Sequence, residues 1–329
     1  MTDKHSLAGK KVLVTGGAGF VGSRLVDHLV RENCGELVVI DNMVRGQVEN
    51  LAGVGDGIVR LVEGDIRDRH LVAQLIDGSD TVFHQAALRI THCAAEPRQA
   101  LEVMVDATFD LLELCLRAKV RKVVFASSAS VYGMADEFPT TERQNPYTNR
   151  TLYGAAKAFG EGLLRSFNDM YGLDYVAFRY FNVYGPGMDL HGKYTEVLIR
   201  WMDRIARGEP PVIFGDGLQT MDFVHVDDVA RANILGAVLP ITDVVFNVGA
   251  EVETSLRDLA GKLAKVMGRE DLAPVHVGDN PVNPVRRRLA DTTVARQMLG
   301  FETRVSLEDG LRDLVAWWRS RQASMGEAA

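Results

Sequence analysis

The sequence contains few cysteines, no run of positive charge and no long apolar stretch. Three cysteines, Cys34, Cys93 and Cys115, occur among 329 residues, an odd number that lacks the paired spacing of zinc ligands. We therefore expect reduced thiols in a cytoplasmic protein. The eight histidines are scattered along the chain, so we expect no metal site.

Charge and hydropathy argue against two further classes of protein. Acidic residues outnumber basic ones by 44 to 37, for a net charge of −7, whereas a nucleic-acid-binding surface needs clustered positive charge. No apolar run reaches the length of a membrane span, and the first residues lack an apolar signal segment. We therefore expect no nucleic-acid partner and no membrane association.

Short apolar segments alternate with amphipathic ones in the first half of the chain. Strands are predicted at residues 11–15, 37–40, 58–62, 81–84, 122–126 and 175–180, and helices at 19–32, 96–118 and 149–171. This alternation predicts an α/β fold with a doubly wound parallel sheet of the Rossmann type.

The alternation weakens after residue 186. Helices are predicted at 196–206, 226–238, 256–267 and 307–319, with Ser306 as the N-cap of the last one, and a short strand at 244–248. We predict a first domain at residues 1–186 and a smaller lobe at 187–329, with some elements of the lobe returning to the first domain.

A glycine-rich turn follows the first predicted strand and opens the first helix. Its glycines are Gly16, Gly19 and Gly22. They suit a tight turn, a close backbone approach to a pyrophosphate, and close packing of helix on strand, while the helix N-terminus attracts the anion. Phe20 and Val21 lie in the same turn. A glycine turn that binds no ligand is the alternative.

Asp41 closes the second predicted strand, about 20 residues beyond the turn, where a carboxylate accepts the ribose hydroxyls of NAD and repels the 2′-phosphate of NADP. The sequence therefore favours NAD as the cofactor, although Arg45 nearby weakens the discrimination. Asn42 follows Asp41, and Asp65 and Ile66 follow the third strand, where they are placed to flank the adenine; Asp65 can also be an ordinary turn residue.

Tyr153 and Lys157 are four residues apart on the predicted helix 149–171. This spacing places both side chains on one helix face. An ammonium beside a phenol favours the phenolate and lowers its pKa, so the pair can act as a tuned base. An ordinary surface pair with the same spacing is the alternative. A base and a dinucleotide site in one chain indicate oxidoreductase-type chemistry.

With these features placed, the chain resembles the extended short-chain dehydrogenase/reductase superfamily, and within it the NAD-dependent nucleotide-sugar epimerases and dehydratases. Further matching segments run along nearly the whole chain: His84-Gln85-Ala86-Ala87, Ser127-Ser128-Ala129-Ser130-Val131-Tyr132-Gly133, Arg179-Tyr180-Phe181-Asn182-Val183-Tyr184-Gly185, Asp222-Phe223-Val224-His225-Val226-Asp227-Asp228 and Ala290-Asp291.

The resemblance implies a role for each matching residue. Tyr153 would be the catalytic base, Lys157 would bind the nicotinamide ribose, and Ser128 would hydrogen-bond the reacting hydroxyl. Asn182 would face the diphosphate of the substrate. Other residues would border the cofactor, namely Ala86, Ala87, Ser127, Tyr180 and Val183. The resemblance also implies a homodimer paired through helices 96–118 and 149–171.

The reaction is inferred from residues that are absent. The chain has Ala129 and Ser130 at two positions where the 4,6-dehydratases that it resembles carry Asp and Glu. The decarboxylases usually carry a Glu at the second of these positions. The resemblance therefore implies a 4-epimerase acting on UDP-glucose, UDP-galactose or UDP-glucuronate. A dehydratase or decarboxylase with unusual acid–base placement is the alternative. A non-catalytic NAD-binding regulator on the same fold is the alternative in which the protein is not an enzyme.

The cations that bind the substrate are less evident. Met221 stands where many relatives have an arginine that grips the diphosphate, Met104 replaces a common asparagine, and residues 280–283 replace a frequent Arg-x-Gly-Asp. Phosphates still require charge-assisted bonds. The candidate substrate-binding residues are Arg89, Ser128, Ser130, Asn182, Lys193, Arg200 and Arg288. The run from Arg286 to Arg288 can equally be a solvated patch.

Overall fold

The computed structural model describes residues 5–55, 57–190, 196–278 and 285–326. Its centre is a seven-stranded sheet in the order β10-β6-β5-β4-β1-β2-β3, and every neighbouring pair is parallel. This confirms the doubly wound α/β fold. The strands are β1 (Lys11–Thr15), β2 (Glu36–Asp41), β3 (Val59–Glu63), β4 (Thr81–His84), β5 (Lys122–Ser128), β6 (Asp174–Tyr180) and β10 (Val244–Val248).

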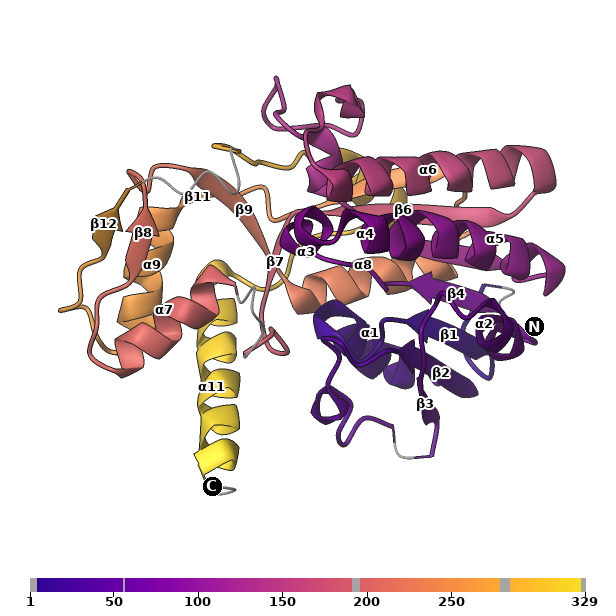
Figure 1. Ribbon diagram of the computed structural model, residues 1–329, viewed down its shortest axis with the longest axis horizontal. Helices are drawn as coiled ribbons and strands as arrows, with labels where there is room; N and C mark the ends of the chain where they lie inside the picture. Colours follow the sequence, from indigo (N-terminus) through magenta and orange to yellow (C-terminus); the bar gives the residue numbers. More distant parts are fainter. Residues whose placement is uncertain (1–4, 56, 191–195, 279–284, 327–329) are drawn as a thin grey trace.

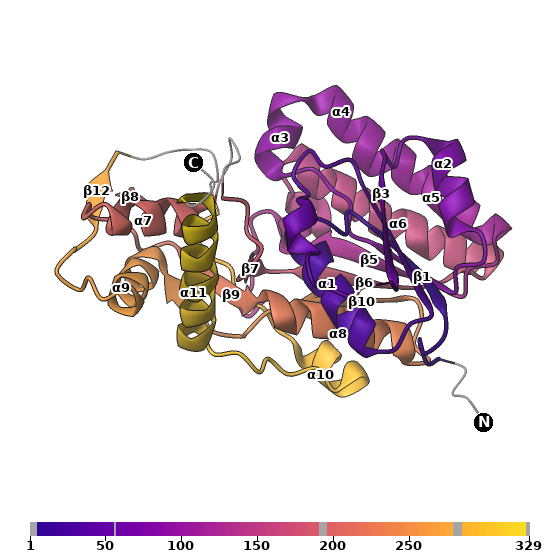
Figure 2. The ribbon, with the colours of Figure 1, turned by 90° about the horizontal axis from the view of Figure 1, so that it is seen from below.

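Helices cover both faces of this sheet (Figures 1 and 2). One face carries α2 (Arg69–Ile76), α5 (Ala107–Arg117) and α6 (Leu152–Tyr171), and the other carries α1 (Phe20–Arg31) and α8 (Val226–Val238). Side chains of β1 show why both faces are covered: Val12 and Val14 join one core cluster, and Leu13 joins the other. A strand buried on both sides in this way reads as a continuous apolar run.

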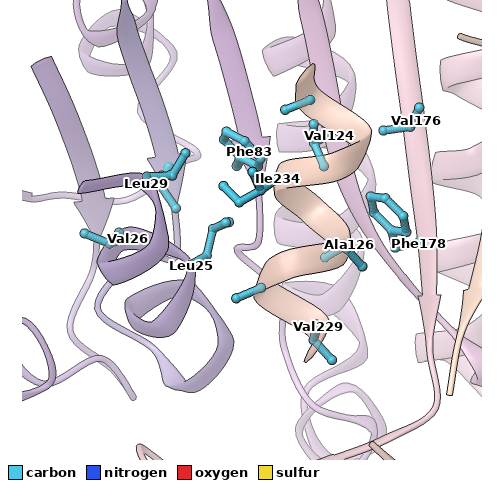
Figure 3. Close-up of a cluster of buried hydrophobic side chains, with 14 of the residues drawn as sticks. Leu25, Val26, Leu29, Phe83, Val124, Ala126, Val176, Phe178, Val229 and Ile234 are labelled. Carbon is cyan, nitrogen blue, oxygen red and sulfur yellow. The ribbon is translucent and has the colours of Figure 1, made fainter. Parts of the chain in front are cut away.

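The core on the α1–α8 face is shown in Figure 3. Leu25 and Leu29 of α1 lie on the same side of α8 as Phe83, near Ile234, and Phe178 of β6 lies on the other side of α8. All of these side chains except Ile234 are fully buried. Helix α8 belongs to the second half of the sequence, as does β10, so the sheet unit is completed by chain that follows residue 187.

A buried lysine secures the end of α8. Lys122 is 1% exposed, and its ammonium donates to the carbonyl oxygens of Gly236 at 3.0 Å, Leu239 at 2.7 Å and Ile241 at 2.7 Å. Carbonyls at a helix C-terminus have no partner within the helix, so Lys122 supplies one. Burial lowers the pKa of Lys122 to about 8, and the charge of Arg121 acts in the same direction.

The second lobe has its own core. Trp201, Leu259 and Leu311 are buried together on α7 (Val197–Ala206), α9 (Leu256–Val266) and α11 (Leu307–Gly326). Two small sheets complete the lobe: β11 (Glu253–Ser255), β9 (Thr220–His225) and β7 (Asn182–Tyr184) form one, and β12 (Val275–Val277) with β8 (Val212–Phe214) form the other. Helix α10 (Thr293–Leu299) returns to the sheet unit beside β10. Ser306 caps α11 as predicted, accepting from Asp309 N at 3.1 Å.

The predicted long helix at 96–118 is interrupted. It consists of α4 (Pro97–Leu101), a π-helical turn at Glu102–Asp106 and α5, and a further short helix, α3 (Ile90–Ala95), precedes it. A single extra residue in one turn leaves the apolar spacing almost unchanged, so periodicity could not show it. The sequence analysis also missed α2, whose N-cap Asp68 accepts from His70 N and Leu71 N, and the short strands of the second lobe.

In the part of the chain that the structure describes, no helix has the length and apolar character needed to cross a membrane.

Candidate active site

The candidate site lies at the carboxyl edge of the large sheet. The strand order reverses between β1 and β4, which is the point at which doubly wound sheets bind their ligands. A cavity of about 590 Å³ opens there. It is lined by residues that follow β1, β2, β4, β5 and β6, together with residues of α6 and of the segment after β7.

The glycine-rich turn adopts the geometry that its sequence predicted. Gly16 has a positive φ of 68°, and a Cβ there would lie 2.7 Å from the Ala86 Cα. A Cβ on Gly22 would lie 2.2 Å from the Gly16 carbonyl oxygen, so the first turn of α1 can pack on β1 only without a side chain. Gly19 is the N-cap of α1, and its position leaves the first amides of the helix directed at the cavity.

Asp41 is the last residue of β2, as predicted, and is 8% exposed. Its carboxylate accepts from Ala18 N and from Met43 N, both at 3.0 Å. Burial raises the pKa of Asp41, while these amides and the Arg45 charge oppose the rise. Two backbone bonds fix the carboxylate and leave further lone pairs for a ligand at the cavity wall.

Tyr153 and Ser128 meet at the inner end of the cavity. Burial raises the pKa of Tyr153, and a hydrogen bond with Ser128 and the charges of Arg288 and Arg45 oppose the rise. The net direction is opposite to the lowering that we expected from Lys157. Burial is the dominant cause, and Lys157 is not among the groups that oppose it. The Lys157 ammonium instead donates to the Ala126 carbonyl oxygen at 2.5 Å and lies 5.8 Å from the centroid of the tyrosine ring.

Lys157 lies beneath the tyrosine and is itself buried. Its pKa is lowered to about 8 by burial, with Cys93 and Glu161 acting in the opposite direction. Glu161, one helical turn further along α6, accepts from the Ser127 hydroxyl and pairs with Arg179 through Oε2 at 2.6 Å and Oε1 at 2.9 Å. This buried pair fixes α6 to the ends of β5 and β6, and so holds Lys157 beside Ser127 and Ser128.

A chain of hydrogen bonds positions the backbone after β4. The Thr108 hydroxyl donates to the Met104 carbonyl at 3.0 Å, so His84 Nε2 must donate to Thr108, and His84 Nδ1 accepts from Thr15 at 2.7 Å. Thr15 in turn accepts from Ala86 N at 3.2 Å. Burial lowers the pKa of His84 to about 3, with the Lys157 charge acting in the same direction. The neutral imidazole thus links the π-helical turn to the cavity wall.

Arginines at the cavity mouth are paired with carboxylates from the second lobe. Arg89, the N-cap of α3, forms an ion pair with Glu196, and Arg45 Nε lies 3.7 Å from Asp189 Oδ2. Burial lowers the pKa of Arg45 and Arg89 adds to this, whereas Glu196 and Asp189 oppose it. A bound anion would therefore compete with two carboxylates for these guanidinium groups.

The remaining predicted cations occupy different places. Arg288 donates to the Ala129 carbonyl oxygen at 2.6 Å, beside the serines of the site. Arg200 is exposed on α7 and is not among the residues that line the cavity. Arg286 and Arg287 pair with Asp216 and Glu253 at the surface. Lys193 and residues 280–283 lie outside the described residues.

The cavity brings together nearly all of the predicted cofactor residues. The lining includes Gly16, Gly19, Phe20, Val21, Gly22, Asp41, Asn42, Asp65, Ile66, Ala86, Ala87, Ser127, Tyr153, Lys157, Tyr180 and Asn182, and also Arg89, Ser128 and Ser130. Val183 and Arg288 are not part of it. Sequence reasoning missed Thr91, His92, Gln99, Asp189 and Glu196, which also line the cavity. They lie on short helices and loops whose sequences carry no periodic or motif signal.

A second cluster of titratable groups lies away from the cavity. His225, Asp227 and Asp313 are close enough to one another to hold a metal ion. Asp227 already accepts from Arg24 Nη2 at 2.8 Å and from His28 at 3.0 Å. These contacts join α1 to α8, and His225 Nε2 lies 3.4 Å from Asp313 Oδ2 of α11. The cluster is thus accounted for as an ionic link between the sheet unit and the second lobe.

Comparison with known proteins agrees with this geometry. Residues 12–249 match the model of the NAD dependent epimerase/dehydratase family. The chain is 36% identical to the UDP-glucose 4-epimerase of Mycolicibacterium smegmatis, over 94% of this chain and 99% of that one.

Two solved structures resemble the whole chain. The UDP-glucose 4-epimerase of Thermotoga maritima with UDP-glucose superposes with a TM-score of 0.88 at 35% identity, covering 95% of this chain and 99% of that one. MoeE5 in complex with UDP-glucuronic acid and NAD gives 0.83 at 33% identity, covering 94% and 99%. The chain belongs to the NAD-dependent epimerase/dehydratase family.

Proposed function

We propose that this protein is an NAD-dependent nucleotide-sugar 4-epimerase, an isomerase that acts on a UDP-sugar. The observation that carries the proposal is the meeting of Ser128, Tyr153 and Lys157 in the cavity at the strand-order reversal, with no acidic side chain at positions 129 and 130. The relatives named as UDP-glucose 4-epimerases support it.

The residues fit NAD along the length of the cavity. Asp41 would accept the adenosine ribose hydroxyls, the first turn of α1 would face the pyrophosphate, and Lys157 would bind the nicotinamide ribose. Asn42, Asp65 and Ile66 would border the adenine, and Ala86, Ala87, Ser127, Tyr180 and Val183 would border the remainder. NAD supplies a reversible hydride acceptor for the carbon at C4 of the sugar.

The side chains move the proton. Tyr153 as phenolate would take the proton of the C4 hydroxyl as C4 loses its hydride, and Ser128 would hydrogen-bond the same oxygen. The 4-keto sugar would then rotate, the hydride would return to the opposite face of C4, and Tyr153 would give the proton back. Substrate and product are isomers, so no net oxidation occurs and the cofactor can stay bound.

A dehydratase or decarboxylase is the second candidate, because relatives of this chain include a dTDP-glucose 4,6-dehydratase. Dehydration requires an acid–base pair at C5 and C6 in addition to Tyr153. Ser130 lines the cavity at the relevant position and Ala129 has no ionisable group, so the epimerase is favoured.

The test is incubation of purified protein with UDP-glucose, UDP-glucuronate and dTDP-glucose, followed by mass spectrometry and NMR. An epimerase gives a product of unchanged mass with inverted configuration at C4. Loss of water or of carbon dioxide would replace the proposal by the second candidate. Absence of any conversion by a folded protein that binds NAD would favour a non-catalytic regulator.

We also propose which part of the chain binds each ligand, how two copies of the protein assemble, and in which compartment the protein works. Residues 1–186 would bind NAD and residues 187–329 mainly the nucleotide sugar, with α8 and β10 completing the first unit. A homodimer would form through α5 and α6, whose outer faces expose Phe109 and Phe159. The three cysteines are free and buried, which is compatible with the cytoplasm.

A further inference from the structure

We infer that Arg288 makes the sugar site selective for an acidic nucleotide sugar, one that carries a carboxylate at C6 of the hexose. This inference rests on the proposed 4-epimerase function and specifies the class of substrate for the same site. The residue proposed to recognise the substrate comes from the second lobe, whereas Ser128, Tyr153 and Lys157 come from the sheet unit.

The position of Arg288 is fixed by a backbone contact. Its Nη1 donates to the Ala129 carbonyl oxygen at 2.6 Å, and Ala129 lies between Ser128 and Ser130, which both line the cavity. Arg288 is also close enough to the Tyr153 hydroxyl for each group to shift the pKa of the other. The guanidinium therefore lies next to the backbone that joins two cavity-lining serines, and its charge acts on the Tyr153 phenol.

The electrostatic environment of Arg288 is unusual for an arginine of this chain. Burial lowers the pKa of Arg288 to about 10, and Tyr153 is the group that opposes the fall. Among the described residues, no carboxylate lies within ion-pair distance of Arg288, whereas its neighbours Arg286 and Arg287 pair with Asp216 and Glu253. A guanidinium has five N–H donors, so a half-buried one that makes a single hydrogen bond within the described residues has donors left to bind an anion.

The geometry of a hexose decides which anion this is. Catalysis requires C4 beside Tyr153 and Ser128. In the pyranose ring C1, which bears the diphosphate, lies opposite C4, whereas C6 is two bonds from C4. A cation near C4 can therefore contact the substituents at C3 or C6 but not the diphosphate at C1, and of these two positions C6 is the one that carries an anion in an acidic hexose. A hydroxymethyl group there leaves the charge without a partner, but a carboxylate forms a bidentate, charge-assisted pair.

The experiment compares UDP-glucuronate with UDP-glucose as substrates for the wild-type protein and three variants. Arg288→Met removes the charge at similar length, Arg288→Lys keeps the charge without the fork, and Arg287→Met removes a surface arginine from the adjacent position. The readout is kcat/KM for each nucleotide sugar, together with the inhibition constant of UDP, which carries the diphosphate and no hexose.

We expect the wild type to prefer UDP-glucuronate. Arg288→Met should lower kcat/KM for UDP-glucuronate about 10- to 100-fold more than for UDP-glucose, as for loss of a charge-assisted bond. Arg288→Lys should retain part of the preference, and Arg287→Met should retain all of it. The inhibition constant of UDP should stay within about twofold of the wild type in every variant.

Three outcomes would overturn the inference. If Arg288→Met weakens both sugars and UDP equally, the guanidinium binds the diphosphate. If the wild type epimerises UDP-glucose but not UDP-glucuronate, the 4-epimerase proposal stands and the acidic-sugar inference falls. If the wild type epimerises neither sugar, the proposed function itself fails, which the same assay distinguishes.

Discussion

At the residue scale, the proposed chemistry depends on how the phenol of Tyr153 becomes ionised. Burial raises its pKa, and the groups that oppose this rise are Ser128, Arg288 and Arg45. Arg288 and Arg45 come from parts of the sequence far from Tyr153. The pKa of the proposed base is therefore adjusted by groups that the Tyr153–Lys157 spacing does not reveal, and Lys157 is not among them.

Tyr153→Phe tests the base directly. The substitution keeps the ring and removes the ionisable oxygen, so the epimerisation rate should fall by about 100- to 10,000-fold. Steady-state kinetics with the preferred UDP-sugar provide the measurement. NAD binding and the unfolding midpoint, measured on the same preparation, should stay close to wild type. A variant that binds NAD and turns over at nearly the wild-type rate would show that another group is the base.

At the scale of secondary-structure elements, polar side chains in the interior fix the helices and loops that carry the site. The chain from Thr108 through His84 and Thr15 to Ala86 joins α5, β4 and β1. It begins at the π-helical turn, whose Val103 reaches the cavity. π-Helical turns are rare and often occur at functional sites, and here the turn directs α4 and α5 around the cavity wall.

His84 makes folding sensitive to acid. The folded pKa, about 3, lies below the ordinary value of 6.5, so between these values the unfolded chain binds a proton that the folded chain does not. The contribution of His84 to the free energy of unfolding is therefore fully present above pH 6.5. It declines as the pH falls below that value, by up to about 1.4 kcal/mol per pH unit. Urea unfolding at pH 7.5, 6.5 and 5.5 measures the slope.

His84→Gln is the matched variant, because an amide can donate and accept but does not titrate in this range. It should be less stable than the wild type at pH 7.5 and should lose less stability between pH 6.5 and 5.5. An unchanged slope in the variant would assign the acid sensitivity to other groups.

Lys122 supports α8 in a different way. Lys122→Met keeps the length of the side chain but removes the donor to the carbonyl oxygens of Gly236 and Ile241, and leaves that of Leu239 with Ile241 N alone. Buried polar groups without partners are costly, so the free energy of unfolding should fall by about 2–4 kcal/mol. Chemical denaturation measures the change. Lys265→Met, on the exposed face of α9, should change it by less than about 0.5 kcal/mol, and a similar loss in both variants would refute the capping role.

These elements also show how far a sequence can be interpreted. The sheet strands, the glycine turn and the place of Asp41 were predictable, because each depends on local periodicity or on one steric requirement. The π-helical turn, the ion pairs of Arg45 and Arg89, and the contact of Arg288 with Ala129 were not. The π-helical turn leaves the apolar spacing almost unchanged. The ion pairs and the Arg288 contact arise where the chain after β7 folds back over the sheet, so they depend on tertiary contacts between residues as many as 159 positions apart.

At the scale of the whole molecule, the site is shared between two units. The sheet unit supplies the glycine turn and Tyr153, while the chain after β7 supplies Asp189 and Glu196 to the cavity lining and Arg288 to the Ala129 backbone behind it. Ion pairs cross from Arg89 to Glu196 and from Arg45 to Asp189 at the mouth of the cavity. A substrate diphosphate would be bound between the units, so its affinity depends on their relative placement.

The outer face of α4, α5 and α6 indicates how two copies of the molecule would associate (Figure 1). Large apolar side chains are exposed there, namely Leu101, Phe109, Phe159, Met170 and Tyr171. Phe159 is 52% exposed and Phe109 41%, and exposed apolar side chains gathered on one group of helices are typical of a protein–protein interface. Because α6 also carries Tyr153 and Lys157, pairing through this face would support the catalytic helix of each copy.

Phe159→Glu tests the dimer. A charge on each copy near a self-complementary interface costs several kcal/mol, so sedimentation velocity at micromolar concentration should show a dimer for the wild type and a monomer for the variant. The control is Met298→Glu on α10, an apolar side chain of comparable exposure, 43%, that lies outside this face; it should remain dimeric. A wild type that sediments as a monomer would refute the dimer. A Phe159→Glu variant that stays dimeric would place the contact between copies elsewhere.

The monomeric variant should keep its NAD site, because Phe159 is not among the cavity residues, but α6 should lose its partner helices. We therefore expect a lower unfolding midpoint for the Phe159→Glu protein together with NAD affinity close to that of the wild type.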